Sequence, residues 1–340
     1  LFAGEFGGEV LLDGEDVTSL PMYKIAEKVG SVFQNPRTQF FNVDTTSELS
    51  FGCENLGMPR DEILQRLQRT VSALKMESLL GRSIFDLSGG EKQKIACGGA
   101  FMMDPQVFVL DEPSSNLDSD SISDLRETIA YLRSLGKTVV LSEHRLYYLR
   151  GIADRYVYLK DGRIAGDYTA EQFERIPEAE RRRMGLRTNR LSALTFEEGA
   201  VPSPASARLS DFCFAYQNAP ETLKIASADI PYGGIVGIIG HNGAGKSTFS
   251  RCFCGLEKRC GTVTVNGTSC RARERLNKCY MVMQDVGHQL FTESVLDEVL
   301  ISMAEEDEKE AERILAGLDL AALSGRHPAS LSGGQKQRLA

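Results

Sequence analysis

Short apolar runs alternate with polar segments along the chain. The clearest runs are residues 235–239 (IVGII), 107–110 (VFVL) and 138–141 (TVVL), and each leads into a glycine-rich, acidic or histidine-containing segment. Apolar runs of four or five residues predict buried strands. The residues that follow GHNGAGKST at 240–248 predict a helix start. Strands that lead through polar loops into helices are typical of an α/β fold.

The segment 240–248 fits the pattern G-x-x-x-x-G-K-[ST] between a predicted strand and a predicted helix. Its glycines let the backbone curl until N–H groups surround a phosphate at the positive end of the helix. Lys246 adds a charge for the β- and γ-phosphates of ATP, and the Ser247 hydroxyl suits Mg²⁺. A glycine-rich turn without a ligand is the alternative. The predicted nucleotide-binding set is Gly240, Asn242, Gly243, Gly245, Lys246, Ser247 and Thr248.

Composition limits the classes of function. The chain has 340 residues with 42% hydrophobic content, which predicts two domains with sizeable cores. Its formal net charge of −8 argues against a nucleic-acid backbone as the main partner. We expect neither a membrane-spanning run nor a signal peptide, and therefore a soluble protein that docks on other components.

The chain has 8 cysteines without a disulfide-type framework, as expected of reduced thiols. Five lie in one region, but they lack the paired C-x-x-C spacing of zinc sites, so we do not predict a metal there. These five are Cys252, Cys254, Cys260, Cys270 and Cys279. We predict no special role for His241, His288 and His327.

The chain contains an internal repeat. SVFQNPRTQFF at 31–41 matches MVMQDVGHQLF at 281–291, and LSGGEKQKIA at 87–96 matches LSGGQKQRLA at 331–340. A period near 250 residues means two whole domains of one fold. A third landmark is a glycine spacing shared by Gly4, Gly8 and Gly14 with Gly255, Gly261 and Gly267.

The repeat predicts two domains, 1–180 and 208–340, joined by a linker at 181–207. By this spacing, the lysine equivalent to Lys246 falls before Leu1, and the acid equivalent to Asp111 falls after Ala340. We therefore expect both domains to be incomplete within these residues. The first lacks a phosphate loop, and the second lacks its acidic strand end.

Two carboxylates follow the predicted strand at 107–110. Asp111 can reach Mg²⁺ through water, and Glu112 can orient and deprotonate an attacking water. An ordinary acidic strand end is the alternative. His144 ends the next predicted strand, where it suits a hydrogen bond to a γ-phosphate oxygen, although a structural histidine is the commoner outcome.

Both LSGG segments precede a charged predicted helix. A hydroxyl and exposed N–H groups at a helix start suit a phosphate, whereas a plain helix cap is the alternative. Two copies with the same flanking residues favour the phosphate site. Its residues are Ser88, Gly89 and Gly90 in the first copy and Ser332, Gly333 and Gly334 in the second.

These motifs, together with VFVLDEP at 107–113 and SSNLD at 114–118, resemble the nucleotide-binding domains of ABC ATPases over nearly the whole chain. The resemblance implies a P-loop NTPase core sheet with a helical subdomain in each domain. It also implies a head-to-tail pair that sandwiches two ATP molecules, each between one phosphate loop and the other domain's LSGG.

By position, the resemblance assigns further roles. Tyr216 would stack on adenine, unless it is a core tyrosine, and Asp118 would lie at the facing interface. Gln34 and Gln284 would contact the metal and link it to the transport machinery. The implied metal ligands around Mg²⁺ are Ser247, Asp111, Gln34 and Gln284, and the implied catalytic residues are Glu112, His144, Gln34 and Gln284.

A finer resemblance concerns residues 34–63, which look like the ATPases of energy-coupling-factor transporters for vitamins and transition-metal ions. Residues 283–300 and 141–164 look similar to versions with both ATPases fused in one chain. The implied partners are a membrane scaffold subunit and a substrate-binding membrane subunit, at the cytoplasmic face of the membrane. The scaffold would dock near Phe40, Phe41, Leu290 and Phe291, unless these side chains fill each domain's core.

The sequence thus predicts an ATP hydrolase that drives an importer, with little activity in these 340 residues alone because neither site is complete. A soluble tandem ABC protein acting on ribosomes is the alternative, but its long charged linker is not present at 181–207. A chromosome-organising ATPase would carry long heptad helices between Gln284 and Ser332, where none is predicted. A binding module with inactive ATPase sites is a further alternative for these residues.

Overall fold

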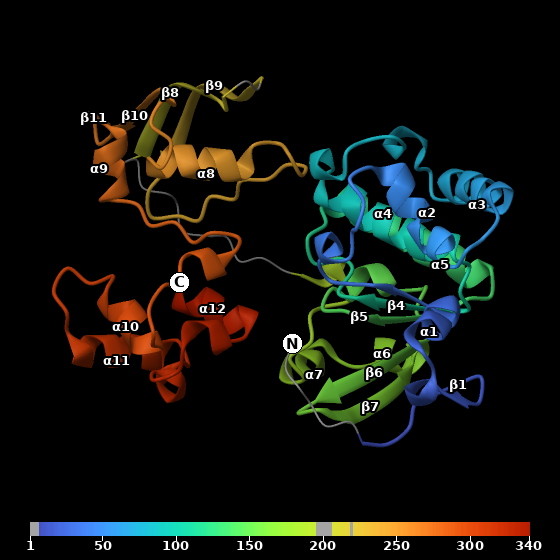
Figure 1. Cartoon of the computed structure of the whole chain (residues 1–340). Helices are drawn as coiled ribbons and strands as arrows, with labels where there is room; N and C mark the ends of the chain where they lie inside the picture. The colour runs from blue at the N-terminus through green and yellow to red at the C-terminus, as the bar shows by residue number, and fades with distance from the viewer. Residues whose placement is uncertain (1–6, 195–205, 218–219) are drawn as a thin grey trace. The chain divides into compact units, whose positions relative to one another are not determined.

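A computed structural model of the chain describes residues 7–194, 206–217 and 220–340 (Figure 1). Contacts between residues divide the chain into two units. The first unit contains Leu1–Glu198 and Gly240–Ala244, and the second contains Gly199–Ile239 and Gly245–Ala340. In the described part of the chain, no helix is both long and apolar enough to span a membrane.

A parallel sheet of three strands is the centre of the first unit. Its order is β3 (Val29–Val32), β4 (Val107–Asp111) and β5 (Thr138–Ser142). The sequence prediction of strands at β4 and β5 is confirmed. Phe108 and Leu110 are buried on one face, whereas Val109 on the other face is 39% exposed. The sheet is therefore buried on one face only, because successive side chains of a strand point to opposite faces.

Helices α4 (Gly89–Met102) and α5 (Ser119–Ser134) pack on the buried face (Figure 1). Ile122 and Ile129 of α5 are in the same buried cluster as Leu110 of β4. Burial of such aliphatic side chains contributes about 1.5–3 kcal/mol each relative to exposure. This packing fixes both helices on the sheet.

The helical part of the first unit consists of α2 (Thr45–Asn55) and α3 (Arg60–Ala73) beside α4. Leu49, Met76 and Ile95 are fully buried in one cluster there. A Cβ atom at Gly98 of α4 would lie 2.8 Å from Leu49 and 2.9 Å from Met76. Glycine at this position therefore lets α4 approach its neighbours closely.

The rest of the first unit is made of short elements. The β6–β7 hairpin leads into α6 and α7, and the aromatic rings of Tyr156 and Phe173 stack there at 4.1 Å. The elements are β1 (Leu11–Leu12), β2 (Glu15–Asp16), α1 (Met22–Lys28), β6 (Arg155–Lys160), β7 (Arg163–Thr169), α6 (Ala170–Glu174) and α7 (Glu178–Arg183). Short 3-10 helices in both units are Val17–Ser19, Pro36–Thr38, Glu77–Leu79, Ile84–Asp86, Tyr147–Leu149, Leu191–Ala193, Val286–His288, Ala321–Leu323 and Pro328–Ser330.

The predicted linker at 181–207 begins inside the first unit. Arg181 is 3% exposed, and its guanidinium donates to Asn189 and, at 2.8 Å, to the Phe173 carbonyl. Residues 195–205 of the predicted linker lie outside the described residues, as do 1–6 and 218–219 of the flanking domains. The domain limits 1–180 and 208–340 remain predictions.

The first half of the second unit is an antiparallel sheet with one long helix. The strand order is β11 (Thr268–Cys270), β10 (Thr262–Val265), β8 (Ser206–Ala215) and β9 (Glu221–Pro231). Helix α8 (Lys246–Cys254) contributes Cys252 to a core with Leu209, Phe212 and Val263. The buried Arg275 of α9 (Ala272–Leu276) donates to the Cys252 and Phe253 carbonyls at 3.1 and 2.9 Å, so α9 is tied to the end of α8.

The second half of this unit is helical. It contains α10 (Val295–Leu300), α11 (Glu308–Gly317) and α12 (Gly333–Leu339). Val295, Leu315 and Leu320 are fully buried in their common cluster. The α/β fold with helical parts in both units agrees with the sequence prediction.

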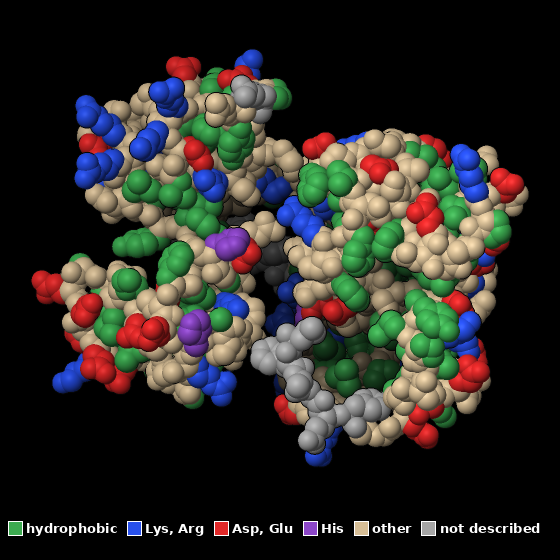
Figure 2. Space-filling model, in the orientation of Figure 1, with side chains coloured by type: hydrophobic (Ala, Val, Ile, Leu, Met, Phe, Trp, Pro, Cys, Tyr) green, Lys and Arg blue, Asp and Glu red, His purple; other side chains and the backbone are tan. Residues whose placement is uncertain are grey.

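The prediction of a buried strand at 235–239 is wrong in this structure. These residues are not in a strand, and Ile235 and Ile239 are 104% and 92% exposed. Among the described residues, none forms a sheet ladder with them. An apolar run forms a strand only where a neighbouring strand accepts its backbone hydrogen bonds. Figure 2 shows hydrophobic side chains on the surface of each unit.

Candidate functional site

The carboxyl ends of β4 and β5 bring polar residues together in the first unit. The two strands are parallel, and Asp111 lies opposite Ser142 in the register. The Ser142 hydroxyl donates to Asp111 Oδ1 at 2.6 Å and accepts the Glu112 N–H at 3.1 Å. Ser142 therefore holds both predicted acidic residues at the strand end, a role that the sequence analysis missed.

The Glu112 carboxylate is the point at which three distant segments meet. Gln34 Nε2 donates to Glu112 Oε2 at 2.9 Å, and His144 Nε2 lies 3.1 Å from Glu112 Oε1. The Glu112 side chain is 28% exposed and that of His144 is 70% exposed, so solvent reaches both. A carboxylate beside an imidazole and an amide can accept a proton from water and orient other polar groups.

The backbone at Glu112 is unusual. Its φ angle is +39°, in a region that residues other than glycine rarely adopt. Such backbone costs on the order of 1–3 kcal/mol and is concentrated at functional sites. The strained position supports the idea that Glu112 has a role beyond packing.

Residues beside His144 were also missed. Arg145 donates to the carbonyls of Leu117 and Ser115 at 3.1 and 3.4 Å, which ties the segment after β5 to the loop before α5. Glu143 accepts several hydrogen bonds in the same place. The available signal was a run of four polar residues, SEHR, directly after an apolar strand.

The phosphate-loop prediction concerns segments of both units. Gly240, Gly243 and Gly245 have φ angles of +152°, +86° and +88°, as the prediction of a curled glycine backbone requires. The predicted helix is confirmed, because α8 begins at Lys246 directly after Gly245. A Cβ atom at Gly245 would lie 3.0 Å from Leu223, so packing also favours glycine there.

Within the first unit, the segment Gly240–Ala244 contacts the loop before α5. The Asn242 N–H donates to Asp118 Oδ2 at 3.0 Å, and Asp118 Oδ1 accepts the Ser121 N–H as the N-cap of α5. The hydrogen bonds from Asn242 and Ser121 lower the pKa of Asp118 to about 2. His241, for which no role was predicted, lies 3.5 Å from Asp120.

Tyr216 lies beside the start of α8 in the second unit. Its hydroxyl is 3.2 Å from the Thr248 hydroxyl, and its ring is 44% exposed. The ring also makes an edge contact with Phe214 at 4.9 Å. An exposed ring disfavours the alternative of a core tyrosine. Lys246 is half-buried, Thr248 is buried and Ser247 is exposed at this helix start.

Both LSGG segments form the same helix cap. Ser88 Oγ accepts the Glu91 N–H at 3.3 Å, and Ser332 Oγ accepts the Gln335 N–H at 3.3 Å. The N3 side chains return the bond to the serine N–H at 2.7 and 2.9 Å. This is a capping box. A cap explains the serines and leaves the phosphate role of Ser88, Gly89 and Gly90, and of Ser332, Gly333 and Gly334, as a prediction.

The two predicted glutamines differ. Gln34 contacts Glu112, whereas Gln284 is an exposed residue of the second unit. Of the four apolar residues that follow the glutamines, two are exposed and two are partly buried. Phe41 and Phe291 are 74% and 81% exposed, whereas Phe40 packs on the core and Leu290 is half-buried. The two exposed phenylalanines leave a docking role open.

The cysteines show no sign of a metal site. All eight are free, and no group of three or more His, Cys, Asp or Glu side chains in the described ranges is arranged to hold an ion. Burial raises the pKa of Cys97 to about 12, so that this thiol stays protonated at neutral pH.

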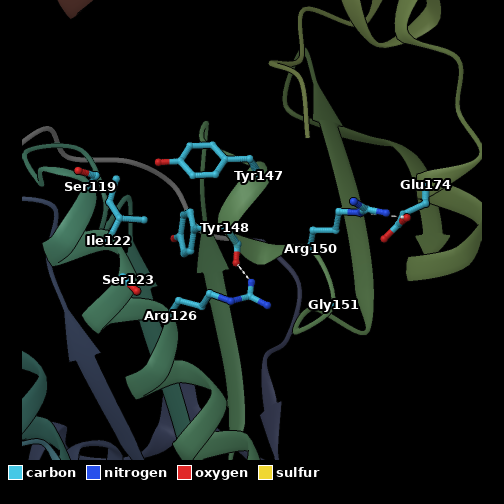
Figure 3. A pocket seen from close by; sticks show the side chains of 9 residues that line it. All are labelled: Ser119, Ile122, Ser123, Arg126, Tyr147, Tyr148, Arg150, Gly151 and Glu174. Carbon is cyan, nitrogen blue, oxygen red and sulfur yellow. Dashed lines mark hydrogen bonds and ion pairs between the residues drawn. The ribbon is translucent and has the colours of Figure 1, made fainter. Parts of the chain in front are cut away.

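A pocket of about 600 Å³ lies beside the start of α5 in the first unit (Figure 3). Its two arginines are both engaged, since Arg126 donates to the Tyr148 carbonyl and Arg150 Nε lies 3.2 Å from Glu174. Ser119, Ile122, Ser123, Tyr147 and Gly151 complete the lining. Because neither guanidinium is directed to an outside ligand, we assign none to this pocket.

Comparison with known proteins bears on these features. The sequence profile of the family described as ABC transporter matches residues 3–115 and 223–340. A Treponema denticola protein named as an ABC transporter ATP-binding protein is 43% identical over 346 residues, covering 100% of this chain and 71% of its own length. A Methanosarcina mazei protein with the same name is 31% identical over 396 residues, covering 99% of this chain and 67% of its own length.

A solved structure, cbiO1 from Clostridium perfringens, part of the ABC transporter complex cbiONQ, is 28% identical. The match covers 52% of this chain and 71% of that chain, with a TM-score of 0.47. The family assignment rests on the two profile matches and the two sequence relatives, and not on this solved structure. The chain belongs to the ABC transporter family of ATP-binding proteins and carries two segments of the family's ATPase fold.

Proposed function

We propose that the chain binds ATP with Mg²⁺ and supplies the hydrolytic residues that drive an importer of the energy-coupling-factor type. The observation that carries the hydrolytic part is the convergence of Gln34 and His144 on Glu112. Gln34 is 78 positions before Glu112 and His144 is 32 positions after it, so the fold, and not closeness in the sequence, brings the three side chains together. The cargo would be a vitamin or a transition-metal ion, as the sequence resemblance implies.

In the proposed reaction, water attacks the γ-phosphate in line with the leaving group. Glu112 accepts the proton of that water, and His144 donates a hydrogen bond to a γ-phosphate oxygen. Lys246 offsets charge on the β- and γ-phosphates of a second ATP molecule, at a separate site. Each of these groups is solvent-accessible or half-buried, as contact with a nucleotide requires.

The residues at hand suit Mg²⁺. At one proposed site Asp111 presents a carboxylate that accepts the Ser142 hydroxyl, and at the other Ser247 presents an exposed hydroxyl at a helix start. Oxygen ligands of this kind are those that Mg²⁺ prefers, and Gln34 and Gln284 would add amide oxygens. The ion would neutralise charge that develops on the phosphate oxygens.

We further propose that the two ABC domains pair head to tail. Lys246 would then act with Ser88–Gly90 at one ATP site, and Glu112 and His144 would act with Ser332–Gly334 at the other.

The membrane partners are proposed from the resemblance of residues 34–63, 141–164 and 283–300. The exposed rings of Phe41 and Phe291 support a docking surface for a membrane scaffold, because large exposed apolar side chains are enriched at interaction sites. The location would be the cytoplasmic face of the membrane.

A pull-down of the natural full-length protein from solubilised membranes tests the importer assignment. Recovery of a polytopic scaffold with a small membrane subunit is expected, and the small subunit would identify the cargo. Recovery of ribosomes instead would contradict the importer and leave the ATP chemistry intact.

Glu112→Gln tests the hydrolytic assignment in the same assembly. Loss of the general base is expected to lower kcat by about 10²–10⁴-fold. Glu127→Gln is the matched control, because the Glu127 carboxylate forms an exposed ion pair with Lys75 at 2.9 Å, on the surface of α5. Full turnover in Glu112→Gln would remove Glu112 from the mechanism.

A further inference from the structure

The carboxylate of Glu143 accepts hydrogen bonds from three separate segments of the first unit. Oε1 accepts the Ser114 N–H at 3.1 Å and the Tyr148 hydroxyl at 2.8 Å. Oε2 accepts the N–H groups of His144 at 2.7 Å and Arg145 at 2.8 Å. Each carboxylate oxygen of Glu143 thus accepts hydrogen bonds from two donors.

The donors belong to the loops that carry the proposed hydrolytic residues. Ser114 lies two residues after Glu112, in the turn that leaves β4. His144 and Arg145 lie in the turn that leaves β5. One carboxylate therefore spans the two loops whose side chains meet in the Glu112–His144 pair at 3.1 Å.

Burial strengthens this link. Ser114 is 0% exposed, Tyr148 is 3% exposed, and Glu143 itself is half-buried. Burial, followed by the nearby Glu143 charge, raises the pKa of Tyr148, so that its hydroxyl stays protonated and can donate. Hydrogen bonds to a charged group in a shielded place are stronger than exposed ones, and a missing partner is costly.

We propose that Glu143 is a positioning residue that fixes Glu112 and His144 relative to one another. This inference rests on the proposed hydrolysis at Glu112 and adds a residue to it. Glu143 makes no contact with the Glu112 side chain in the described structure, and its oxygens are directed to backbone donors and a tyrosine. It acts through the loops and has no part in proton transfer.

The proposal predicts an effect on turnover and little on substrate binding. A displacement of about 1 Å in a catalytic group costs as much as 10²-fold in rate. Three of the four Glu143 donors are backbone groups of the two loops, so their release displaces Glu112 and His144. The proposed nucleotide contacts of Lys246 and of the LSGG residues are on other elements.

Glu143→Gln in the natural full-length protein, assembled with its membrane partners, provides the test. The amide keeps the shape of the side chain but leaves one acceptor oxygen in place of two. We expect kcat to fall about 10- to 100-fold with KM for ATP nearly unchanged. Tyr148→Phe removes one of the four hydrogen bonds and is expected to give a smaller fall in kcat.

Glu174→Gln is the matched control. Glu174 is also a partly buried glutamate that joins separate segments. It accepts from Arg150 at 3.2 Å (Figure 3). It also accepts from Arg190 at 3.4 Å. It lies outside the proposed hydrolytic residues, so kcat should match that of the wild type. Amide hydrogen exchange adds a readout without turnover, because Ser114, His144 and Arg145 should exchange faster in Glu143→Gln and not in Glu174→Gln.

The outcomes separate the two proposals. Wild-type kcat in Glu143→Gln, with Glu112→Gln inactive, would overturn the positioning role alone. Equal losses of kcat in Glu143→Gln and Glu174→Gln, in proportion to lost thermal stability, would also overturn it in favour of a purely structural role. Full turnover in Glu112→Gln would overturn the proposed hydrolytic site itself.

Discussion

The two copies of the repeat share their local hydrogen bonds and differ in their strands. Gln39 Oε1 accepts a backbone N–H at 2.9 Å, and Gln289 Oε1 accepts the equivalent one at 2.7 Å. Glu48 Oε2 accepts two consecutive N–H groups at 3.0 and 2.8 Å, and Glu298 Oε2 does the same at 2.9 and 2.9 Å. These hydrogen bonds join residues fewer than ten positions apart, and they are reproduced in both copies.

The strand before each glutamine behaves differently. Val29–Val32 forms β3 and pairs with β4, whereas the equivalent residues 279–282 are not in a strand. Val32 is 1% exposed, but Val282 is 50% exposed. Equivalent segments of the repeat therefore differ in structure, and the buried strand forms where a neighbouring strand is paired with it. Turns and caps form from nearby residues, whereas a strand forms only where another strand pairs with it.

The largest expected effect is that of removing Lys246 from the phosphate loop, which is present in the second copy of the repeat. Lys246→Ala should weaken ATP binding about 10- to 150-fold, because a hydrogen bond to a charged group contributes about 1.5–3 kcal/mol. Lys258→Ala, at an exposed position of the same unit, is the control and should bind normally. Equilibrium binding of a fluorescent ATP analogue measures both. Equal affinity in the two variants would remove the phosphate loop from nucleotide binding.

The contrast between local contacts and strand pairing also explains what the sequence could predict. The helix after the phosphate loop was predicted correctly, because the positive φ angles of its glycines are a local demand on the backbone. The strands that carry Asp111 and precede His144 were also predicted correctly, since their β-branched residues have partners. The prediction of a strand at 235–239 was wrong. None of the described residues pairs with this segment in a sheet, and the segment is exposed.

Glu143 shows a second limit of sequence reasoning. A glutamate between Ser142 and His144 has no spacing that signals four hydrogen bonds. Its donors are backbone groups in turns and one tyrosine, so they are recognisable only when the fold is known. By contrast, Glu112 is recognisable from its place after an apolar run.

The LSGG glycines offer the next test of the comparison. A Cβ atom at Gly90 would lie 2.2 Å from Ser121 Oγ and 2.8 Å from its Cβ, whereas one at Gly334 would meet nothing within 4 Å. Gly90→Ala is therefore expected to destabilise α4 by about 1–3 kcal/mol through overpacking. Gly334→Ala should be neutral or stabilise α12 by about 0.4–1 kcal/mol. Segment-resolved hydrogen exchange measures both, and equal effects would contradict the difference in packing.

The serine caps test the similarity of the copies. Ser88→Ala and Ser332→Ala each remove a side-chain acceptor at 3.3 Å from an N–H of the first turn. Both losses are expected to be about 1 kcal/mol, in α4 and α12 respectively. Hydrogen exchange of the two helices under mild urea gives the values. A loss in one helix alone would show that these caps, despite equal geometry, differ in their contribution to stability.

Asp118 is a helix cap of a different kind, because it titrates. Its pKa is lowered to about 2, first by the Asn242 N–H and then by Ser121, so its charge stabilises the fold above the ordinary aspartate pKa of about 4. That contribution is lost as the pH falls through about 2.

Asp118→Asn keeps a good N-cap residue and removes the charge. Wild type should exceed Asp118→Asn in unfolding free energy by less than about 1 kcal/mol at pH 6, because solvent screens a partly exposed carboxylate. The difference should shrink as the pH is lowered from about 4 to about 2. Urea unfolding of the first unit at several pH values measures it. A difference that stays constant through this window would mean that Asp118 acts through its cap geometry, as Ser88 and Ser332 do, and not through its charge.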